Sequence, residues 1–327
     1  MHLLHCLAAG ILVLNSCMVH AQDTTTQPPF VQTAVKNILF KTTPEGDSLL
    51  LDLFRPNIVT TTPTPVLIII HGGAWVIGDR NLEDYSYVRK LRDELVKNNM
   101  TVISIEYTLV KSNRHFPSPI ADCQDAIRWV RSNANQFQLD TSRIGLWGAS
   151  AGGHLALLSA NAHDSSWKGS AGLSAYPNSV RYVVDNFGPT DLTDMLQLNA
   201  GKFKIFLAKI FIPKALKLRN RLIQDIFNLD MKTHKDSIIT VAHTYSPMHY
   251  INATTLPTLI FHGTKDRLVP YRQSKLLQKV LDDHQVSNKL ITVKRGNHGF
   301  TNISPEKTDE LVRETVAFVI EQNAIAK

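Results

Sequence analysis

The chain has 327 residues, of which 43% are hydrophobic and 8% aromatic, and its formal net charge is +7. It can therefore bury one large core, and without internal repeats or low-complexity blocks a division into two small domains is disfavoured. The sequence contains no Cys/His cluster with zinc spacing, no glycine-rich phosphate loop and no dinucleotide fingerprint. We therefore expect no cofactor and no metal.

The first 21 residues are predicted to be a signal peptide. An uncharged apolar run from Cys6 to Leu14 is too short to span a bilayer, and Val19-His20-Ala21 has a small-x-small cleavage pattern. The run departs from the usual form because no Lys or Arg precedes it. Alternatively, Leu14-Asn15-Ser16-Cys17 resembles a lipoprotein cleavage box that would leave Cys17 lipidated. We expect a secreted or periplasmic protein, or else a membrane-tethered lipoprotein.

The next segment, residues 22–35, is polar and rich in proline, and we interpret it as a linker. An α/β domain is expected over residues 36–327. It opens with two short predicted strands, residues 37–40 and 48–54, which form a hairpin-like start. Val66–Ile70 is an unbroken apolar run that favours a strand buried on both faces of a mostly parallel sheet.

The following segments alternate between helix and strand patterns. Helices are predicted for 83–98, 119–137, the run after Gly153, 271–284 and 306–322, and strands for 101–105, the run before Gly148, 181–187, 257–261 and 289–293. This alternation predicts an α/β fold, with a mostly parallel central sheet and helices on both faces.

One basic segment accounts for the whole charge excess. Seven Lys and Arg residues and no acid lie between Gly201 and Gln224. They alternate with large aliphatic and aromatic residues, a pattern that suits a helical lid or a membrane-surface contact through 201–223 better than a nucleic-acid groove. We therefore predict a cap insertion at about 193–245 and no nucleic-acid partner; the oligomeric state stays open.

The pattern Gly148-x-Ser150-x-Gly152 is typical of a nucleophile elbow. In such a turn, an abrupt change from strand to helix exposes a serine hydroxyl above the edge of the sheet, and a Cβ at the flanking positions would collide with neighbouring backbone. The alternative is a glycine-rich turn that only lets a helix pack tightly on a strand.

Acyl transfer by a serine needs a base, a carboxylate that orients the base, and donors for the oxyanion. Because the carboxyl ends of parallel strands lie along one edge of a sheet, loops after four predicted strands can supply them. These loops contain His71-Gly72-Gly73-Ala74, Ser150, Asp266 and His298.

Other residues compete for these roles. Competitors for the base are His71, His154, His249 and His262, and Asp191 competes with Asp266 because it also follows a predicted strand end. We expect other acids to cap or solvate helices, namely Asp122, Asp125 and Asp140. Cys123 is expected to be a buried core thiol.

Four motifs occur in the order that the α/β-hydrolases show: H-G-G-A-W, G-A-S-A-G-G, H-G-T-K-D and N-H-G-F. The chain resembles an α/β-hydrolase of the carboxylesterase, hormone-sensitive-lipase-like branch, with its BD-FAE-like serine esterases, over residues 36–322. This resemblance implies roles for the motif residues: Ser150 as nucleophile, His298 as general base and then acid, Asp266 as orienting carboxylate, and backbone amides of Gly73, Ala74 and Ala151 as the oxyanion hole.

The resemblance also leaves some points open. Ala74 stands where the lipase-like relatives often have a third glycine. The alanine keeps the backbone amide, but its methyl group is expected to narrow the acyl pocket. Trp75 is either a wall of the substrate pocket or a core aromatic.

The predicted function is hydrolysis of a small-molecule or polysaccharide carboxylic ester through an acyl-enzyme. Alternatives are an amide hydrolase of the formamidase type, since H-G-G-x-W also occurs there, or an inactive adhesion or lipoprotein module on the same fold.

Overall fold

A computed structural model describes residues 34–324 except 57–61, 84–85, 112, 163–166, 168, 202–204, 206–209 and 211. The predicted signal peptide and Cys17 lie outside these residues. The first strand, β1, begins at Ala34, two residues inside the predicted linker.

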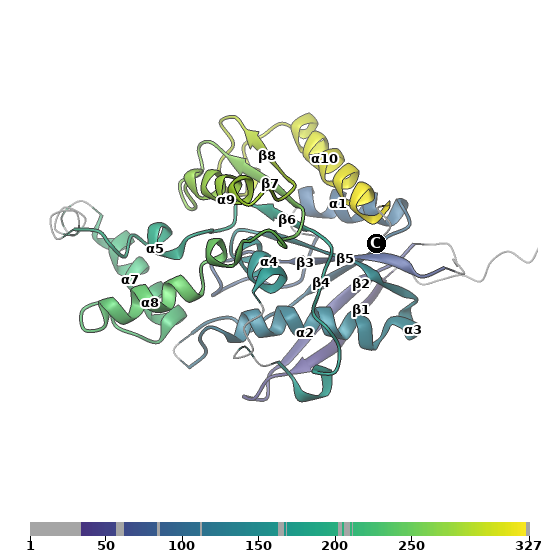
Figure 1. The fold of residues 1–327 in the computed structure, drawn as a ribbon, viewed down its shortest axis with the longest axis horizontal. Helices are drawn as coiled ribbons and strands as arrows, with labels where there is room; N and C mark the ends of the chain where they lie inside the picture. Colours follow the sequence, from purple (N-terminus) through teal and green to yellow (C-terminus); the bar gives the residue numbers. More distant parts are fainter. Residues whose placement is uncertain are drawn as a thin grey trace, which may run out of the picture.

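An eight-stranded sheet forms the centre of the molecule (Figure 1). Its strands lie in the order β1-β2-β4-β3-β5-β6-β7-β8, and all pairs are parallel except β1–β2 and β2–β4. Their bounds are β1 Ala34–Thr42, β2 Ser48–Phe54, β3 Thr64–Ile70, β4 Thr101–Ile105, β5 Leu139–Ala149, β6 Val183–Asn186, β7 Thr258–Gly263 and β8 Asn288–Val293. The predicted α/β fold with a mostly parallel sheet is confirmed.

Helices cover both faces of the sheet (Figure 1). Successive side chains of β3 enter opposite cores: Ile68 packs in a cluster with residues of α2 Ser118–Ser132, α4 Ala151–Asn161 and α9 Arg272–Asp283. Ile69 belongs to a second cluster with residues of α1 Ser86–Lys97 and α10 Pro305–Ala324. This alternation is why β3 is continuously apolar from Val66 to Ile70.

One predicted helix is divided in two. We expected a single helix over 119–137, but α2 ends at Ser132 and a short α3 covers Ala134–Phe137. Asn133 between them has non-helical dihedral angles, and its side-chain amide donates to the Trp129 carbonyl. Asn side chains commonly interrupt helices in this way, because they compete for backbone partners.

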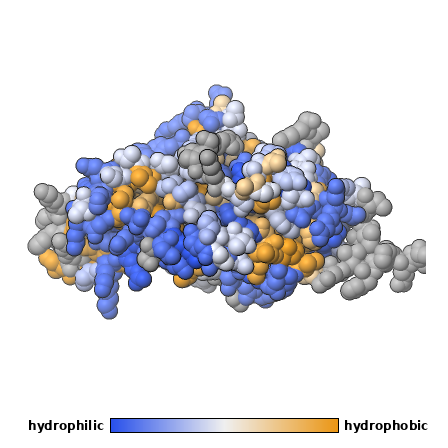
Figure 2. Space-filling model, turned by 90° about the horizontal axis from the view of Figure 1, so that it is seen from below, coloured by the Kyte–Doolittle hydropathy of each residue, from blue (hydrophilic) through white to orange (hydrophobic). Residues whose placement is uncertain are grey.

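The segment between β6 and β7 is largely helical, with α5 Leu192–Met195, α7 Pro213–Phe227 and α8 Lys235–Thr244. It lies at one end of the molecule (Figure 1). Ile223, Ile226 and Phe227 of α7 are buried. On the face seen in Figure 2, hydrophobic and hydrophilic residues are interspersed at this end. Among the helices that the structure describes, none is long and apolar enough to cross a bilayer.

A buried ion-pair network joins β1 to α2. Lys41 Nζ lies 2.7 Å from carboxylate oxygens of both Asp122 and Asp125, and all three side chains are at most 7% exposed. Asp122 also accepts a hydrogen bond from the Thr108 amide, and Arg128 pairs with Asp125. The expectation that Asp122 and Asp125 cap or solvate helices was therefore wrong, because a lysine from a distant strand neutralises them inside the protein.

Replacing Lys41 by Met should destabilise the fold. Burial alone would lower the pKa of Lys41, but the two carboxylates outweigh burial and raise this pKa. The pairing therefore stabilises the fold at any pH below the pKa of Lys41 in the unfolded chain. This stabilisation is lost only as the pH rises through the higher pKa of Lys41 in the folded protein. We expect Lys41→Met to lower the free energy of unfolding by about 3 kcal/mol at pH 7, measured by urea denaturation, because two buried carboxylates lose a partner. Lys97→Met, at an exposed pair, serves as the control. An unchanged stability of Lys41→Met would contradict this account.

Candidate active site

Ser150 occupies a strained turn between β5 and α4. Its φ of 56° and ψ of −120° lie in a region that non-glycine residues rarely adopt. A Cβ at Gly148 would come within 2.1 Å of the Gly152 carbonyl oxygen, and one at Gly152 within 2.0 Å of the Ile70 carbonyl oxygen. The glycines thus let α4 pack tightly on the sheet, as expected for a glycine-rich packing turn. The same packing is accompanied by the unusual backbone conformation of Ser150, as expected for a nucleophile elbow.

Three side chains from different loops meet at this turn. His298 Nε2 lies 3.0 Å from Ser150 Oγ, and His298 Nδ1 lies 2.7 Å from Asp266 Oδ2. The Asp266 side chain is fully buried, while that of His298 is 20% exposed. The imidazole can therefore accept the hydroxyl proton on one nitrogen while it donates to a carboxylate from the other.

The surroundings of Asp266 keep this carboxylate ionised. Its Oδ1 accepts hydrogen bonds from the amides of Leu268 at 2.8 Å and Val269 at 3.0 Å. Burial alone would raise the pKa of Asp266, but hydrogen bonds from His262 and His298 outweigh burial and hold this pKa well below its usual range. An ionised acid at this position fixes the tautomer of His298 and stabilises the imidazolium that forms when the ring accepts a proton.

The turn after β3 lies against the nucleophile. A Cβ at Gly72 would be 3.0 Å from the Ala149 carbonyl oxygen and 3.4 Å from Ser150 Cβ. The next two residues have positive φ, 108° at Gly73 and 51° at Ala74, which is unfavourable for the alanine.

Three backbone amides near this turn are available to an oxyanion. Within the described part of the chain, the amides of Gly73 and Ala74 donate to no other group. Ala151 begins α4, so its amide has no partner within the helix. These are the three donors that the sequence predicts, and their role in catalysis stays a prediction.

Two aromatic residues that sequence reasoning missed support these loops. The Tyr107 hydroxyl, after β4, donates toward the carbonyl oxygens of His71 and Gly72, at 3.1 and 3.2 Å. The Tyr107 ring also stacks on that of His71, with a centroid distance of 4.2 Å. Phe187, after β6, contacts the His298 ring edge-on at 4.8 Å. Both residues follow strand ends at the same edge of the sheet, which was the only available signal.

The competing residues have other contacts. Asp191 caps α5 by accepting the Thr193 amide at 2.8 Å, and His249 stacks on His243. His262 is buried, with its nitrogens 2.6 Å from Ser274 Oγ and 2.9 Å from the Val269 carbonyl oxygen. His71 donates to the Gly72 carbonyl, and His154 donates to that of Tyr245.

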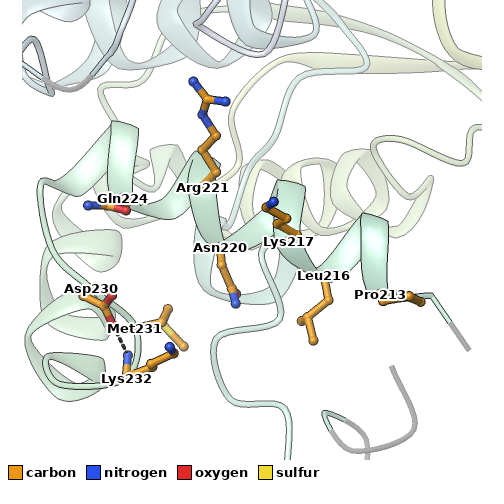
Figure 3. A pocket seen from close by; sticks show the side chains of 9 residues that line it. All are labelled: Pro213, Leu216, Lys217, Asn220, Arg221, Gln224, Asp230, Met231 and Lys232. Atoms are coloured by element: carbon orange, nitrogen blue, oxygen red, sulfur yellow. Dashed lines mark hydrogen bonds between the residues drawn. The ribbon is translucent and has the colours of Figure 1, made fainter. Parts of the chain in front are cut away.

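Trp75 is 1% exposed, so it is a core aromatic in this structure and not an open pocket wall. A groove of about 430 Å³ lies elsewhere, in the insertion between α7 and the turn at 230–232 (Figure 3). Its lining includes Lys217, Arg221 and Lys232 but none of the three residues that meet at the elbow. In the described ranges, no three His, Cys, Asp or Glu side chains are grouped so that they could hold a metal ion.

A buried acid lies beneath the elbow helix. Asp185, on β6, is fully buried, and its Oδ1 accepts the Gly188 amide at 3.0 Å and lies 2.2 Å from the position a Cβ on Gly153 would take. Its Oδ2 has no partner among the residues that the structure describes. Burial outweighs the hydrogen bond from Gly188 and raises the pKa of Asp185 to about 7.

Asp185→Asn should therefore change how stability depends on pH. The folded state keeps the Asp185 proton up to about pH 7, whereas the unfolded chain loses it near pH 3.8, so wild-type stability falls between these values as pH rises. The full effect is on the order of 4 kcal/mol. We expect the melting temperature of Asp185→Asn relative to wild type to rise from pH 5 to pH 8. The exposed Asp236→Asn is the control. A difference that is constant with pH would contradict the prediction.

Comparison with known proteins places this geometry in a family. The BD-FAE family model matches residues 51–281, a range that ends before His298. Esterase LipC of Mycobacterium tuberculosis is 29% identical over 69% of the chain, and Esterase LipQ of the same organism is 30% identical over 73%. The matches cover 50% and 51% of those proteins, so the chain spans about half the length of the curated relatives it matches.

A solved structure agrees with this match. A truncated carbohydrate esterase from gut microbiota superposes with a TM-score of 0.67 and 25% identity, covering 90% of this chain and 97% of that one. The matching model, the strand order and the elbow between β5 and α4 lead to one conclusion: the chain belongs to the BD-FAE family of the α/β-hydrolases.

Proposed function

We propose that the protein hydrolyses carboxylic esters through an acyl-enzyme formed on Ser150. The observation that carries the proposal is the continuous hydrogen-bonded chain from Ser150 Oγ through His298 to the buried carboxylate of Asp266, with bonds of 3.0 and 2.7 Å. The esterase names of the relatives support the reaction class.

In the first half of the reaction, Ser150 Oγ attacks the ester carbonyl carbon while His298 Nε2 accepts the hydroxyl proton. Negative charge that develops on the carbonyl oxygen is stabilised by the amides of Gly73, Ala74 and Ala151. The tetrahedral intermediate collapses as His298 returns the proton to the leaving alcohol, and Ser150 remains acylated.

In the second half, water replaces the alcohol. His298 accepts a proton from the water as it attacks the acyl-serine, and the same three amides stabilise the second oxyanion. Collapse releases the carboxylic acid and returns the proton to Ser150 Oγ. Asp266 stays ionised throughout, because its backbone and histidine hydrogen bonds hold its pKa low.

For the substrate, we infer an acylated carbohydrate or a small acyl ester. Support comes from the gut carbohydrate esterase, which the chain matches over nearly its full length. Ala74 is bulkier than the glycine that relatives often have at this position, which favours a short acyl group such as acetyl.

The predicted cap role of residues 193–245, the export signal and the membrane-surface contact through 201–223 stay predictions. In the described part of 201–223, Ile212 and Leu218 are exposed, and so are Lys214 and Lys217. This mixture of apolar and basic side chains supports a membrane contact. Failure of the protein to sediment with anionic vesicles would contradict that contact.

Ser150→Ala should abolish turnover of p-nitrophenyl acetate. Loss of the nucleophile removes the acyl-enzyme route, so we expect kcat to fall by about 10⁴ or more with an unchanged melting temperature. The matched control is Ser159→Ala, in the helix that follows Ser150. If Ser150→Ala hydrolyses the ester at the wild-type rate, the proposal fails. It also fails if the wild-type protein hydrolyses no ester tested, and that result would favour the alternative of an inactive module.

A substrate series should separate the proposed substrates. We expect kcat/KM to decrease from nitrophenyl acetate to butyrate and longer esters, and acetylated xylan to release acetate. An N-formyl aryl amide tests the amide-hydrolase alternative, because its cleavage at a rate above that of the esters would reverse the assignment. Mass spectrometry of the quenched reaction should show Ser150 carrying the acyl group.

A further inference from the structure

His154 lies one turn after Ser150 in the helix that follows the elbow. Its backbone amide donates to the Ser150 carbonyl at 3.1 Å, and its side chain is completely buried. It belongs to neither the hydrogen-bonded chain of the site nor the oxyanion donors. A buried, titratable ring so close to the nucleophile therefore has no role in the mechanism as described.

The ring of His154 packs directly on the turn that carries the predicted oxyanion donors. It meets Trp75 edge-on at a centroid distance of 5.1 Å and stacks on Phe116 at 5.7 Å, and these two aromatics contact each other at 5.9 Å. Trp75 directly follows Ala74 and itself has a positive φ of 65°. Any movement of this tryptophan is therefore transmitted to a strained backbone segment next to the donors.

The same ring is bonded to the insertion. His154 Nε2 lies 2.7 Å from the carbonyl oxygen of Tyr245, at the end of α8. Since a carbonyl only accepts, Nε2 carries the proton. Phe116 makes a parallel connection, because its amide donates to the Ile226 carbonyl at 3.1 Å and its ring contacts that of Tyr245 at 5.1 Å.

The protonation state of His154 agrees with a fixed, neutral ring. Burial, only partly offset by the bond to Tyr245, lowers its pKa to about 4. Its Nδ1 is buried and has no partner in the described part of the chain, as is also true of Trp75 Nε1. The ring thus makes a single directional bond, to the insertion, and otherwise acts by shape.

We propose that His154 is a positioning residue that holds the elbow helix, the turn of Gly73 and Ala74, and the insertion in one fixed arrangement, so that the three amides converge on the same oxygen. The proposal rests on the proposed ester hydrolysis. It predicts that loss of the bond to Tyr245 weakens stabilisation of the transition state more than binding of the ester.

The test is His154→Phe, which keeps a planar ring but removes the N–H donor. We expect kcat on nitrophenyl acetate to fall about 10- to 100-fold while KM changes less than about threefold, because a small displacement of oxyanion donors acts on the transition state. His154→Gln keeps an amide donor and should recover part of the loss. Inhibition by an aryl trifluoromethyl ketone, which forms a tetrahedral adduct with a serine, should weaken in parallel with kcat/KM.

The matched control is His115→Phe. His115 Nδ1 also bonds a carbonyl of the insertion, that of Asp225 at 2.7 Å, but its ring has no stacking contact with Trp75. We expect this variant to keep its kcat.

The outcomes are distinguishable. Equal losses in both variants would show that docking of the insertion in general matters, and would overturn the role given to His154. A folded His154→Phe with wild-type kcat would overturn it as well. If wild type hydrolyses no ester, the proposed function fails first, whereas an active wild type with an equally active His154→Phe refutes only this inference.

Discussion

The close approach of backbone at Gly148 and Gly152 is the constraint on which the candidate site depends. With no side chain at either position, α4 begins within contact of β3 and β5, and Ser150 takes backbone angles that non-glycine residues rarely adopt. The strain is confined to this turn, and it holds the Ser150 hydroxyl outside the core. There the hydroxyl meets the ring of His298, which lies 148 residues further along the chain.

Electrostatics around the site follow a consistent division. Asp266 is buried beside several donors and stays charged, whereas Asp185 accepts one hydrogen bond from the described residues and keeps its proton below about pH 7. Two carboxylic acids on neighbouring strands or their loops thus have opposite protonation behaviour because of the number of hydrogen bonds each accepts. In the proposed mechanism a protonated Asp185 would favour catalysis, since a negative charge beneath the elbow would oppose the charge on the proposed oxyanion at the start of α4.

Much of the architecture was predictable because the strands are marked by strong local patterns. Residues 66–70 form a continuous apolar run, and residues 101–105 form a β-branched run that only Ser104 interrupts; both strands lie where expected. Ser150, Asp266 and His298 could be identified as candidate site residues because each lies in a short motif after a predicted strand.

Other features depend on partners from distant segments, which local patterns do not carry. The burial of Asp122 and Asp125 requires Lys41 from an edge strand, and the contacts of Tyr107 and Phe187 arise only once the loops are assembled. The break at Asn133 reflects competition between one amide side chain and the helix backbone. The burial of Trp75 likewise depends on Phe116 and His154, which come from separate elements.

The location of β8 at the margin of the sheet has a consequence for how the protein fails. Among the described strands β8 pairs only with β7, and of its residues only Val293 is fully buried, yet the loop that follows it carries His298. Fraying of an outermost strand costs far less than melting the interior. Heat would therefore disconnect the imidazole from the serine while the helices remain intact, and inactivation would precede the loss of circular dichroism.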